Sequence, residues 1–398
     1  MELISVYIRL LPLVLIISCF DWGLYAYYYV YLIFIYAVIG ILRRGLKHGE
    51  VILIASLLII NVLSAVSGYL MGINLNLSWV LQMGMFPFIV LGFSWLGRFH
   101  KEAIDNCMKC ILVGSFSLVI IQFFLGFNNA GIGFAPGTGT KALLSNLASF
   151  SNSGRDSIGM YKSLPHWLAM ASFIYLTHKL SYRWIALIGI ALFLLQIFSG
   201  VKSVLFGSLM VLLVISLRKI NTLYRMPTVI LLIITIVSFF KTKSESINEI
   251  MIFQGRYFEP VFSSVDFGRS PLGFGMGNYY QTAIQNKIIV DTHGYFASTW
   301  RNSGMSQFGM LPVPESDLLL FAVSYGWIFT LITLLFAITY LRKYVGNNNT
   351  RNLSYHALNV LGVFILFSGI FQDWFYTQFT WLFYGLIMNA TEYKNYDA

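Results

Sequence analysis

VILIASLLIINVLSAVSGYL, which is residues 51–70, contains no charged side chain. A helix that crosses the hydrocarbon core of a bilayer needs about 20 mostly apolar residues in a row, and this stretch supplies them. Its length exceeds that of an ordinary buried strand, and it contains no proline that would end a helix. The stretch therefore predicts a transmembrane helix.

The composition of the whole chain agrees with this stretch. Of its 398 residues, 57% are hydrophobic and 11% are charged, against roughly 25% charged residues in an ordinary soluble domain. The mean hydropathy is +0.72. A soluble fold cannot cover so much apolar surface with so few charges. We therefore expect an all-α, polytopic integral membrane bundle in which residues 1–398 form a single membrane domain.

Further apolar runs extend the pattern in both directions from 51–70. They predict about twelve transmembrane helices in total. The expected spans lie near 3–20, 24–42, 51–70, 77–96, 104–125, 165–178, 183–198, 201–217, 227–241, 318–341, 355–372 and 374–389.

Basic residues collect on one side of these spans. The short loops near Asp21, 71–76 and Asp373 hold no lysine or arginine. Because cytoplasmic loops are enriched in basic residues, the other set faces the cytoplasm. We expect both termini there. The basic residues of that set are Arg43, Arg44, Lys47, Arg98, Lys101, Lys109, Lys179, Arg183, Arg218, Lys219, Arg225, Arg342, Lys343, Arg351 and Lys394.

The distribution of basic residues also explains the net charge of +10. A nucleic-acid-binding surface gathers its positive charge on one face or along one helix. Here the excess is spread over many short loops on one side of the membrane. We therefore expect no nucleic-acid partner.

Two predicted outer segments are much longer than the other loops, namely 126–164 and 242–317. Long connections in a compact fold are often functional. Both are therefore expected to be large periplasmic loops that contain the functional residues.

The first long segment ends with three groups that can carry positive charge. Arg155, Lys162 and His166 precede or begin the next predicted span. Such a group suits a phosphate, because arginine and lysine donate charge-assisted hydrogen bonds to its oxygens. The alternative is a basic anchor that stays among the lipid headgroups.

The second long segment contains Arg256, Arg269 and a glycine-rich run at Gly273, Gly275 and Gly277. The arginines are candidates for a substrate phosphate, or else pair with nearby acidic side chains. The run lacks the spacing and context of a dinucleotide-binding loop. It predicts instead a tight turn that lets the backbone approach a ligand or a helix.

Four further candidates lie near the predicted outer surface. Glu315 is placed to act as a general base on a sugar hydroxyl. Asp317 is either a second substrate contact or a cap at the start of the following helix. Lys202 lies at an outer turn close to the apolar zone, where an ionisable group is a functional candidate. His293 is a candidate because it lies in the second long segment.

Several of these pieces, in this order, resemble the bacterial O-antigen polymerase family (Wzy) and, more distantly, the O-antigen ligases. The resemblance covers about 155–330 at the level of motifs. It rests on the segment from Gly159 to Pro165, on Ser199-Gly200-x-Lys202-Ser203, on Gly255-Arg256, on Pro271-Leu272-Gly273-x-Gly275, and on Glu315-Ser316-x-Leu318 followed by Tyr325-Gly326.

The chain departs from the family pattern at two kinds of position. The family often shows an arginine and a glycine with ten residues between them in both outer loops. Here His166 stands eleven positions after Arg155, and Phe267 eleven after Arg256. Ligases tend to carry a His-Asn pair where this chain has Glu315-Ser316, which favours a polymerase.

The resemblance implies a membrane glycosyltransferase of the bacterial inner membrane that acts on undecaprenyl-diphosphate-linked oligosaccharides at the periplasmic face. It implies that Arg155 and Arg256 stabilise the leaving diphosphate and that Glu315 activates the acceptor hydroxyl. Lys162, His166, Lys202, Arg269, His293 and Asp317 are the expected substrate-binding residues. We expect membrane lipid, a chain-length regulator and a flippase as partners, and no metal or cofactor. The alternatives are an O-antigen ligase and a lipid-linked oligosaccharide flippase or other transporter.

Overall fold

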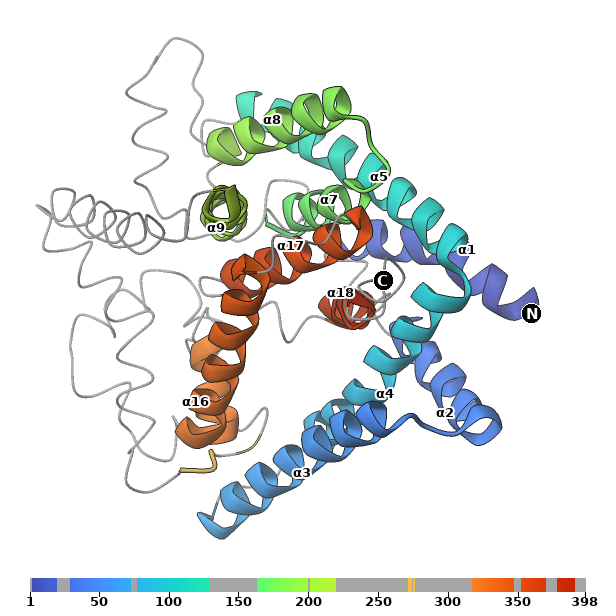
Figure 1. Ribbon diagram of the computed structural model, residues 1–398, viewed down its shortest axis with the longest axis vertical. Helices are drawn as coiled ribbons and strands as arrows, with labels where there is room; N and C mark the ends of the chain where they lie inside the picture. The colour runs from blue at the N-terminus through green and yellow to red at the C-terminus, as the bar shows by residue number, and fades with distance from the viewer. Residues whose placement is uncertain are drawn as a thin grey trace, which may run out of the picture.

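The computed structural model describes residues 2–19, 29–72, 77–128, 163–199, 201–219, 271–273, 275, 317–346, 352–369 and 378–390. Every regular element in these ranges is helical (Figure 1). The helices are α1 (Glu2–Ile17), α2 (Leu32–Arg44), α3 (His48–Leu70), α4 (Leu77–Phe99), α5 (Lys101–Asn128), α7 (Ser163–Leu176), α8 (Tyr182–Ser199), α9 (Lys202–Lys219), α16 (Asp317–Gly346), α17 (Leu353–Ser368) and α18 (Gln378–Ile387).

The helices confirm the all-α class, and they include segments suited to a membrane. Four are long and apolar enough to cross one, namely His48–Leu70, Val80–Phe99, Lys101–Phe123 and Ser324–Gly346. Four shorter apolar helices are Leu3–Ile17, Tyr182–Ile197, Ser203–Arg218 and Leu353–Ser368. The span expected at 227–241 lies outside the described residues. The total of about twelve crossings therefore stays a prediction.

One expected span begins later than its apolar run. The run at 318–341 predicts a span, but α16 is broken at Gly326, whose φ of 80° and ψ of 169° are not helical. Figure 1 shows a sharp bend in α16 at its lower end. The part that begins at Asp317 is consequently a short helix of its own, and the candidate span is Ser324–Gly346.

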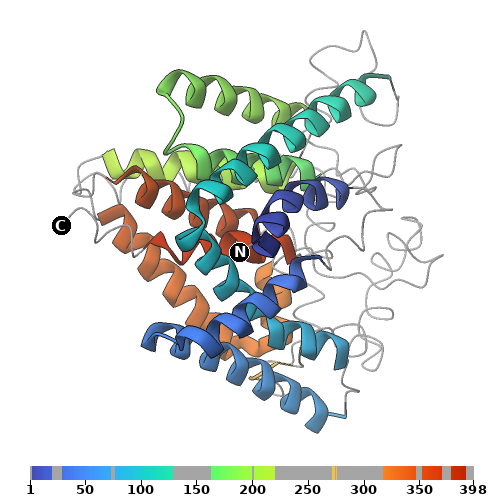
Figure 2. The ribbon, with the colours of Figure 1, turned by 90° about the vertical axis from the view of Figure 1, so that its right-hand side faces the viewer.

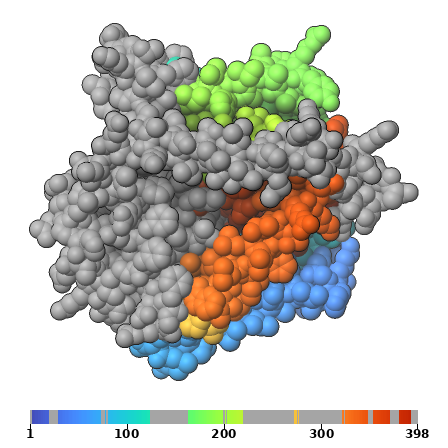
Figure 3. All heavy atoms as spheres, turned by 60° about the vertical axis from the view of Figure 1, so that its left-hand side comes forward, coloured from blue at the N-terminus to red at the C-terminus, as the bar shows by residue number. Residues whose placement is uncertain are grey.

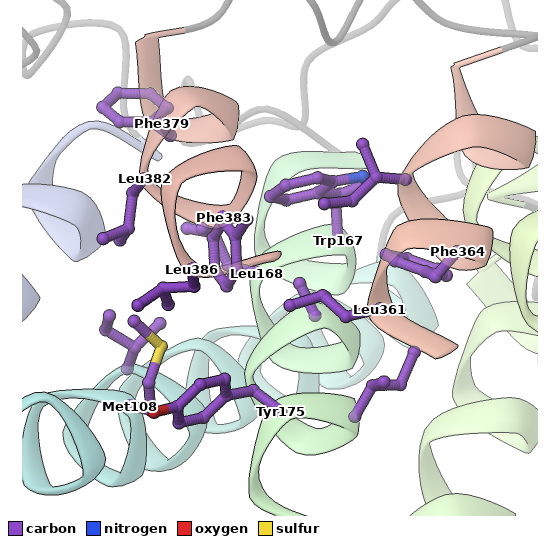
Figure 4. Close-up of a cluster of buried hydrophobic side chains, with 14 of the residues drawn as sticks. Met108, Trp167, Leu168, Tyr175, Leu361, Phe364, Phe379, Leu382, Phe383 and Leu386 are labelled. Carbon is purple, nitrogen blue, oxygen red and sulfur yellow. The ribbon is translucent and has the colours of Figure 1, made fainter. Parts of the chain in front are cut away.

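The core of the bundle surrounds α7. Every residue from Leu164 to Leu176 is buried, and α7 contacts α5, α8, α9 and α17. Trp167 packs edge-on against Phe383 of α18, with ring centroids 5.2 Å apart, and lies 6.0 Å from Phe364 of α17 (Figure 4). A helix without a polar face belongs in the interior of a bundle, which is where α7 lies.

Other helices expose apolar side chains on their outer faces. On α3, Ile52, Ile59 and Leu70 are exposed, and on α16 Leu335 and Phe336 are exposed. In water such continuous apolar surface would favour aggregation or association. In a bilayer it contacts lipid chains, so these faces agree with a membrane location.

Contacts between helix ends give the direction in which each helix runs. They gather polar residues at one end of the bundle, which we call the basic end. It carries the starts of α3, α5 and α17 and the ends of α4, α7 and α9. Three pairs define it: Glu50 with Arg98, Asp105 with Tyr175, and Arg218 with His356.

The opposite end carries the starts of α7 and α9 and the ends of α8 and α17. Trp167 Nε1 donates to Ser368 Oγ there, over 3.1 Å. Figure 2 shows the same bundle from the side. This alternation of helix directions agrees with the alternation predicted from the basic residues, which assigns the opposite end to the periplasm. The assignment of sides stays a prediction.

Candidate functional site

The second long segment is attached to the bundle at the bend in α16. The amide of Gly275 donates to the carbonyl of Ser324 over 2.9 Å, and the amide of Ile328 donates to the carbonyl of Pro271 over 3.4 Å. Figure 3 shows this short segment, in yellow, against the end of α16, in orange. The two hydrogen bonds use backbone groups that the break in α16 leaves free of intrahelical partners.

Glycine is required on both sides of this contact. Gly273 and Gly326 each have a φ of 80°, a conformation that glycine adopts at little cost. A Cβ at Gly273 would lie 2.5 Å from the amide nitrogen of Gly326, and a Cβ at Gly326 would lie 2.5 Å from that of Gly273. The two backbones therefore touch directly. This confirms, for the described residues 271–273 and 275, the expected close approach of the glycine-rich run to a helix; Gly277 lies outside the described residues.

The attachment lies at the end of the bundle opposite the basic end. Downstream of Gly326, α16 runs to Tyr344, whose ring lies 4.4 Å from the guanidinium carbon of Arg218 at the basic end. Around the bend, Tyr325 is buried, and its ring lies tilted against that of Phe321, with the centroids 4.7 Å apart. The bend thus holds the middle of the segment 242–317 against the bundle on the side that the basic-residue pattern assigns to the periplasm.

Two candidate residues are placed by their backbones. Lys202 begins α9 and Asp317 begins α16, and only their backbones are described. The position of Lys202 at a helix start agrees with the predicted outer turn. The position of Asp317 at a helix start agrees with a helix cap. Their substrate contacts stay predictions, as do those of the candidates that lie outside the described residues: Arg155, Lys162, Arg256, Arg269, His293 and Glu315.

His166 is described, and it lies inside the bundle. It occupies the first turn of α7 and has no exposed surface. Neither ring nitrogen has a hydrogen-bond partner among the described residues. The sequence predicts a cation at the mouth of an outer loop, whereas the structure encloses the imidazole between helices. Its role as a substrate ligand therefore requires that a substrate group reach between those helices.

Two buried polar residues at the same end are not among the candidates that the sequence patterns predict. Gln196 of α8 and Ser208 of α9 are buried, and Ser208 Oγ lies 3.0 Å from Gln196 Oε1 and 2.8 Å from the carbonyl oxygen of Val204, the two acceptors within reach of its one proton. Each lies within an apolar run, so hydropathy treats it as part of a span. A lone polar residue inside such a run is a usable signal, because burial without a partner is costly.

At the basic end, charged groups are paired in helix-to-helix contacts. The Asp105 carboxylate is 1% exposed, accepts from the Tyr175 hydroxyl over 2.9 Å, and forms an ion pair with Lys179. His178 Nε2 lies 3.9 Å from the same carboxylate. Since Asp105 lies near the start of α5 and the other three lie at the end of α7, the cluster fixes these two helices to each other.

A second cluster at the basic end fixes α18. Glu50 Oε1 accepts from Trp95 Nε1 over 3.0 Å and from Arg98 Nη1 over 3.4 Å. Arg98 Nε donates to Asn389 Oδ1 over 2.8 Å, as does Ser94 Oγ over 2.7 Å. The hydrogen bonds of this cluster and the ion pair of Asp105 with Lys179 join helices to each other, so both clusters are best understood as structural contacts.

A search for relatives gives no match, whether among protein-family models, curated proteins or solved structures. Within the described part of the chain, no group of three or more His, Cys, Asp or Glu residues is placed to hold a metal ion. The chemistry available at the opposite end comes from the buried imidazole, amide and hydroxyl groups, from helix starts, and from the arginines and Glu315 that the sequence assigns to that side.

Proposed function

We propose that the protein is an O-antigen polymerase, a membrane glycosyltransferase that joins undecaprenyl-diphosphate-linked oligosaccharide repeat units at the periplasmic face. The observation that carries the proposal is the contact between Pro271–Gly275 and the bend at Gly326. These are two separate pieces of the motif set that resembles the polymerases, and about 50 residues of sequence separate them. Their direct contact supports treating the set as one site.

The reaction assigns a task to each motif. The acceptor hydroxyl attacks the anomeric carbon of the donor sugar, and the bond from that carbon to the diphosphate oxygen breaks. Glu315 takes the hydroxyl proton as a general base. Arg155 and Arg256 bind the departing diphosphate, because a guanidinium stabilises developing phosphate charge with two parallel hydrogen bonds. One undecaprenyl diphosphate leaves for each linkage that forms.

The bundle suits substrates that stay attached to lipid. The helices α3 and α16 contact each other, both expose apolar side chains, and α16 carries the attachment of the long segment. A polyprenyl chain can lie against such a face while its sugar stays at the membrane surface. In the cell we expect the flippase that delivers repeat units and a chain-length regulator to act with the protein.

An O-antigen ligase is the second candidate, because it uses the same donor and the same bond cleavage but passes the chain to lipid A-core. The Glu315-Ser316 pair stands where ligases tend to carry His-Asn, and this favours the polymerase. A flippase is a candidate from a different class. It would need no base, and the long outer segments would have no evident task in it.

Lipopolysaccharide from a deletion strain separates the three functions. Loss of a polymerase leaves a single repeat unit on the core. Loss of a ligase or a flippase leaves no repeat at all. We expect the single-repeat pattern, with a full ladder restored by the gene on a plasmid. Core without any repeat would reject the polymerase.

A further inference from the structure

Three buried polar side chains lie between α7, α8 and α9, helices that contact one another pairwise. They are His166, Gln196 and Ser208, with 0%, 0% and 1% of their surface exposed. We call them the α7–α8–α9 site. None of them belongs to the attachment of the long segment at Gly326.

The packing of α7 against α8 brings His166 and Gln196 to one level. The Phe173 ring lies against Gly189, where a Cβ would be 3.3 Å from Cζ. The two helices run in opposite directions. His166 lies seven residues before Phe173 on α7, and Gln196 lies seven residues after Gly189 on α8. Both steps lead toward the end of the bundle opposite the basic end. Because seven residues are nearly two helical turns, both keep the face of the contact residue.

A second chain of contacts, through α17 and α9, leads to the same level. Trp167, the neighbour of His166, donates to Ser368. The Cβ of Ser368 lies 3.0 Å from where a Cβ of Gly207 would be. The next residue is Ser208, whose Oγ lies 3.0 Å from Gln196 Oε1. The contacts through α17 and α9 therefore place Gln196 at the level of His166, as the direct packing of α7 against α8 does.

The site contains polar atoms without partners. Both ring nitrogens of His166 and the Nε2 of Gln196 have no hydrogen-bond partner among the described residues. A buried polar group without a partner loses its hydration and gains nothing in return. These three nitrogens are available to hydrogen-bond a polar group that enters between the helices.

The charge distribution around the site selects an anion. The starts of α7 and α9 lie at this end of the bundle, and helix starts present free N–H groups and partial positive charge. Lys202 begins α9, and residues 163–219 contain no Asp or Glu. His166 is the fourth residue of α7, so it lies about 5 Å below the helix start. That depth is close to the headgroups of a bilayer, where phosphate is the common anion.

We propose that the α7–α8–α9 site binds a phosphate group carried on a lipid, with His166 and Gln196 donating hydrogen bonds to its oxygens. Its assignment to the diphosphate of the lipid-linked donor rests on the proposed function. The phosphodiester of a membrane phospholipid offers the same chemistry.

Binding to the purified full-length protein tests the proposal. The protein is held in dodecyl maltoside, a detergent without phosphate, and receives geranylgeranyl diphosphate, phosphatidylglycerol or inorganic phosphate. The rise in unfolding temperature reports binding, because a ligand that binds only the folded state stabilises it. We expect a rise with at least one of the two lipids. A larger effect of the diphosphate identifies the donor, and a larger effect of phosphatidylglycerol identifies a membrane lipid.

Two variants and one control make the test specific. His166→Phe and Gln196→Leu remove the donors and keep apolar bulk, so each should weaken binding of that lipid at least about tenfold. Without ligand they should be as stable as the wild type or more so, because they remove unsatisfied groups. Ser172→Ala lies on the face of α7 toward Met108 and should leave binding unchanged.

The outcomes separate this inference from the proposed function. The inference is overturned if neither lipid raises the unfolding temperature, if inorganic phosphate alone does so, or if both variants bind like the wild type. If variants that have lost binding still give a normal lipopolysaccharide ladder, the site binds a lipid phosphate but does not bind the diphosphate of the donor. Unchanged binding together with the single-repeat pattern in the deletion strain rejects the site and leaves the polymerase standing.

Discussion

Replacing Gly326 with alanine should release the long segment from the bundle. An alanine at a φ of 80° costs about 1–2 kcal/mol. Its Cβ would press against backbone atoms of Pro271 and Gly273, which cannot rotate away. Losing the hydrogen bonds of Gly275 and Ile328 removes about 1 kcal/mol each. The total of about 3–4 kcal/mol lowers the ratio of attached to released segment by a factor between about 150 and several hundred.

Trypsin cleavage of the purified protein measures that release. Arg269 stands two positions before Pro271, so the peptide bond after it should be cut faster when the segment leaves α16. In cells at matched protein level, Gly326→Ala should lose most of the polymer ladder. Gly84→Ala is the control, because no atom of the described residues lies within 4 Å of its added Cβ and alanine favours a helix interior.

A double variant tests whether the two glycines act through one contact. Either Gly273→Ala or Gly326→Ala alone should release the segment, so combining them should add little further effect. Additive effects would point to two independent sites. A wild-type cleavage rate and a full ladder from Gly326→Ala would refute the contact and, with it, the main support for treating the motifs as one site.

Three other predictions concern residues that the sequence alone assigns to the site or to a side of the membrane. Glu315→Gln removes the base and should abolish polymer in the ladder, whereas Asp317→Asn keeps a helix cap and should retain most activity; equal, mild effects would make both residues caps. Arg256→Ala should slow the reaction about a hundredfold, or about 3 kcal/mol, with Arg256→Lys clearly impaired as well, in a repeat-unit polymerisation assay. Reporter fusions should read periplasmic at Asn286 and cytoplasmic at Lys219, and a cytoplasmic reading at Asn286 would place the proposed site in the wrong compartment.

Sequence patterns locate most helices well, because an apolar run of about 20 residues rarely forms anything except a membrane-spanning helix. The runs at 51–70 and 77–96 match His48–Leu70 and Leu77–Phe99 within a few residues. The run at 318–341 misleads, since hydropathy carries no information on backbone dihedrals. Gly326 fits an apolar run as well as it fits a break, and only its contact with 271–275 decides between them.

Charge patterns give the side of a residue but not its partners. Asp105 and Lys179 both count as loop charges on the same side, which the structure confirms for their end of the bundle. Their ion pair depends on how α5 packs against α7, and that packing is set by apolar side chains spread over both helices. The sequence also gives no reason to assign a contact to His178, which lies beside the same carboxylate.

For the candidate site, local patterns predict local structure and little more. The glycine-rich turn is correctly predicted to approach a helix, but its partner lies about 50 residues away and is identifiable only in three dimensions. His166 looks like part of a basic outer mouth because Arg155 and Lys162 precede it in the chain. Its enclosure beside α8, with Gln196 at the same level, follows from helix packing.

Reconstitution with a lipid-linked substrate tests the central claim most directly. The purified protein, in proteoliposomes with undecaprenyl-diphosphate-linked repeat units as the only substrate, should produce lipid-linked chains of two and more repeats. One undecaprenyl diphosphate should be released for each new linkage, and Glu315→Gln at the same protein level should release none. Repeat units that stay single, with no release of undecaprenyl diphosphate, would contradict a polymerase.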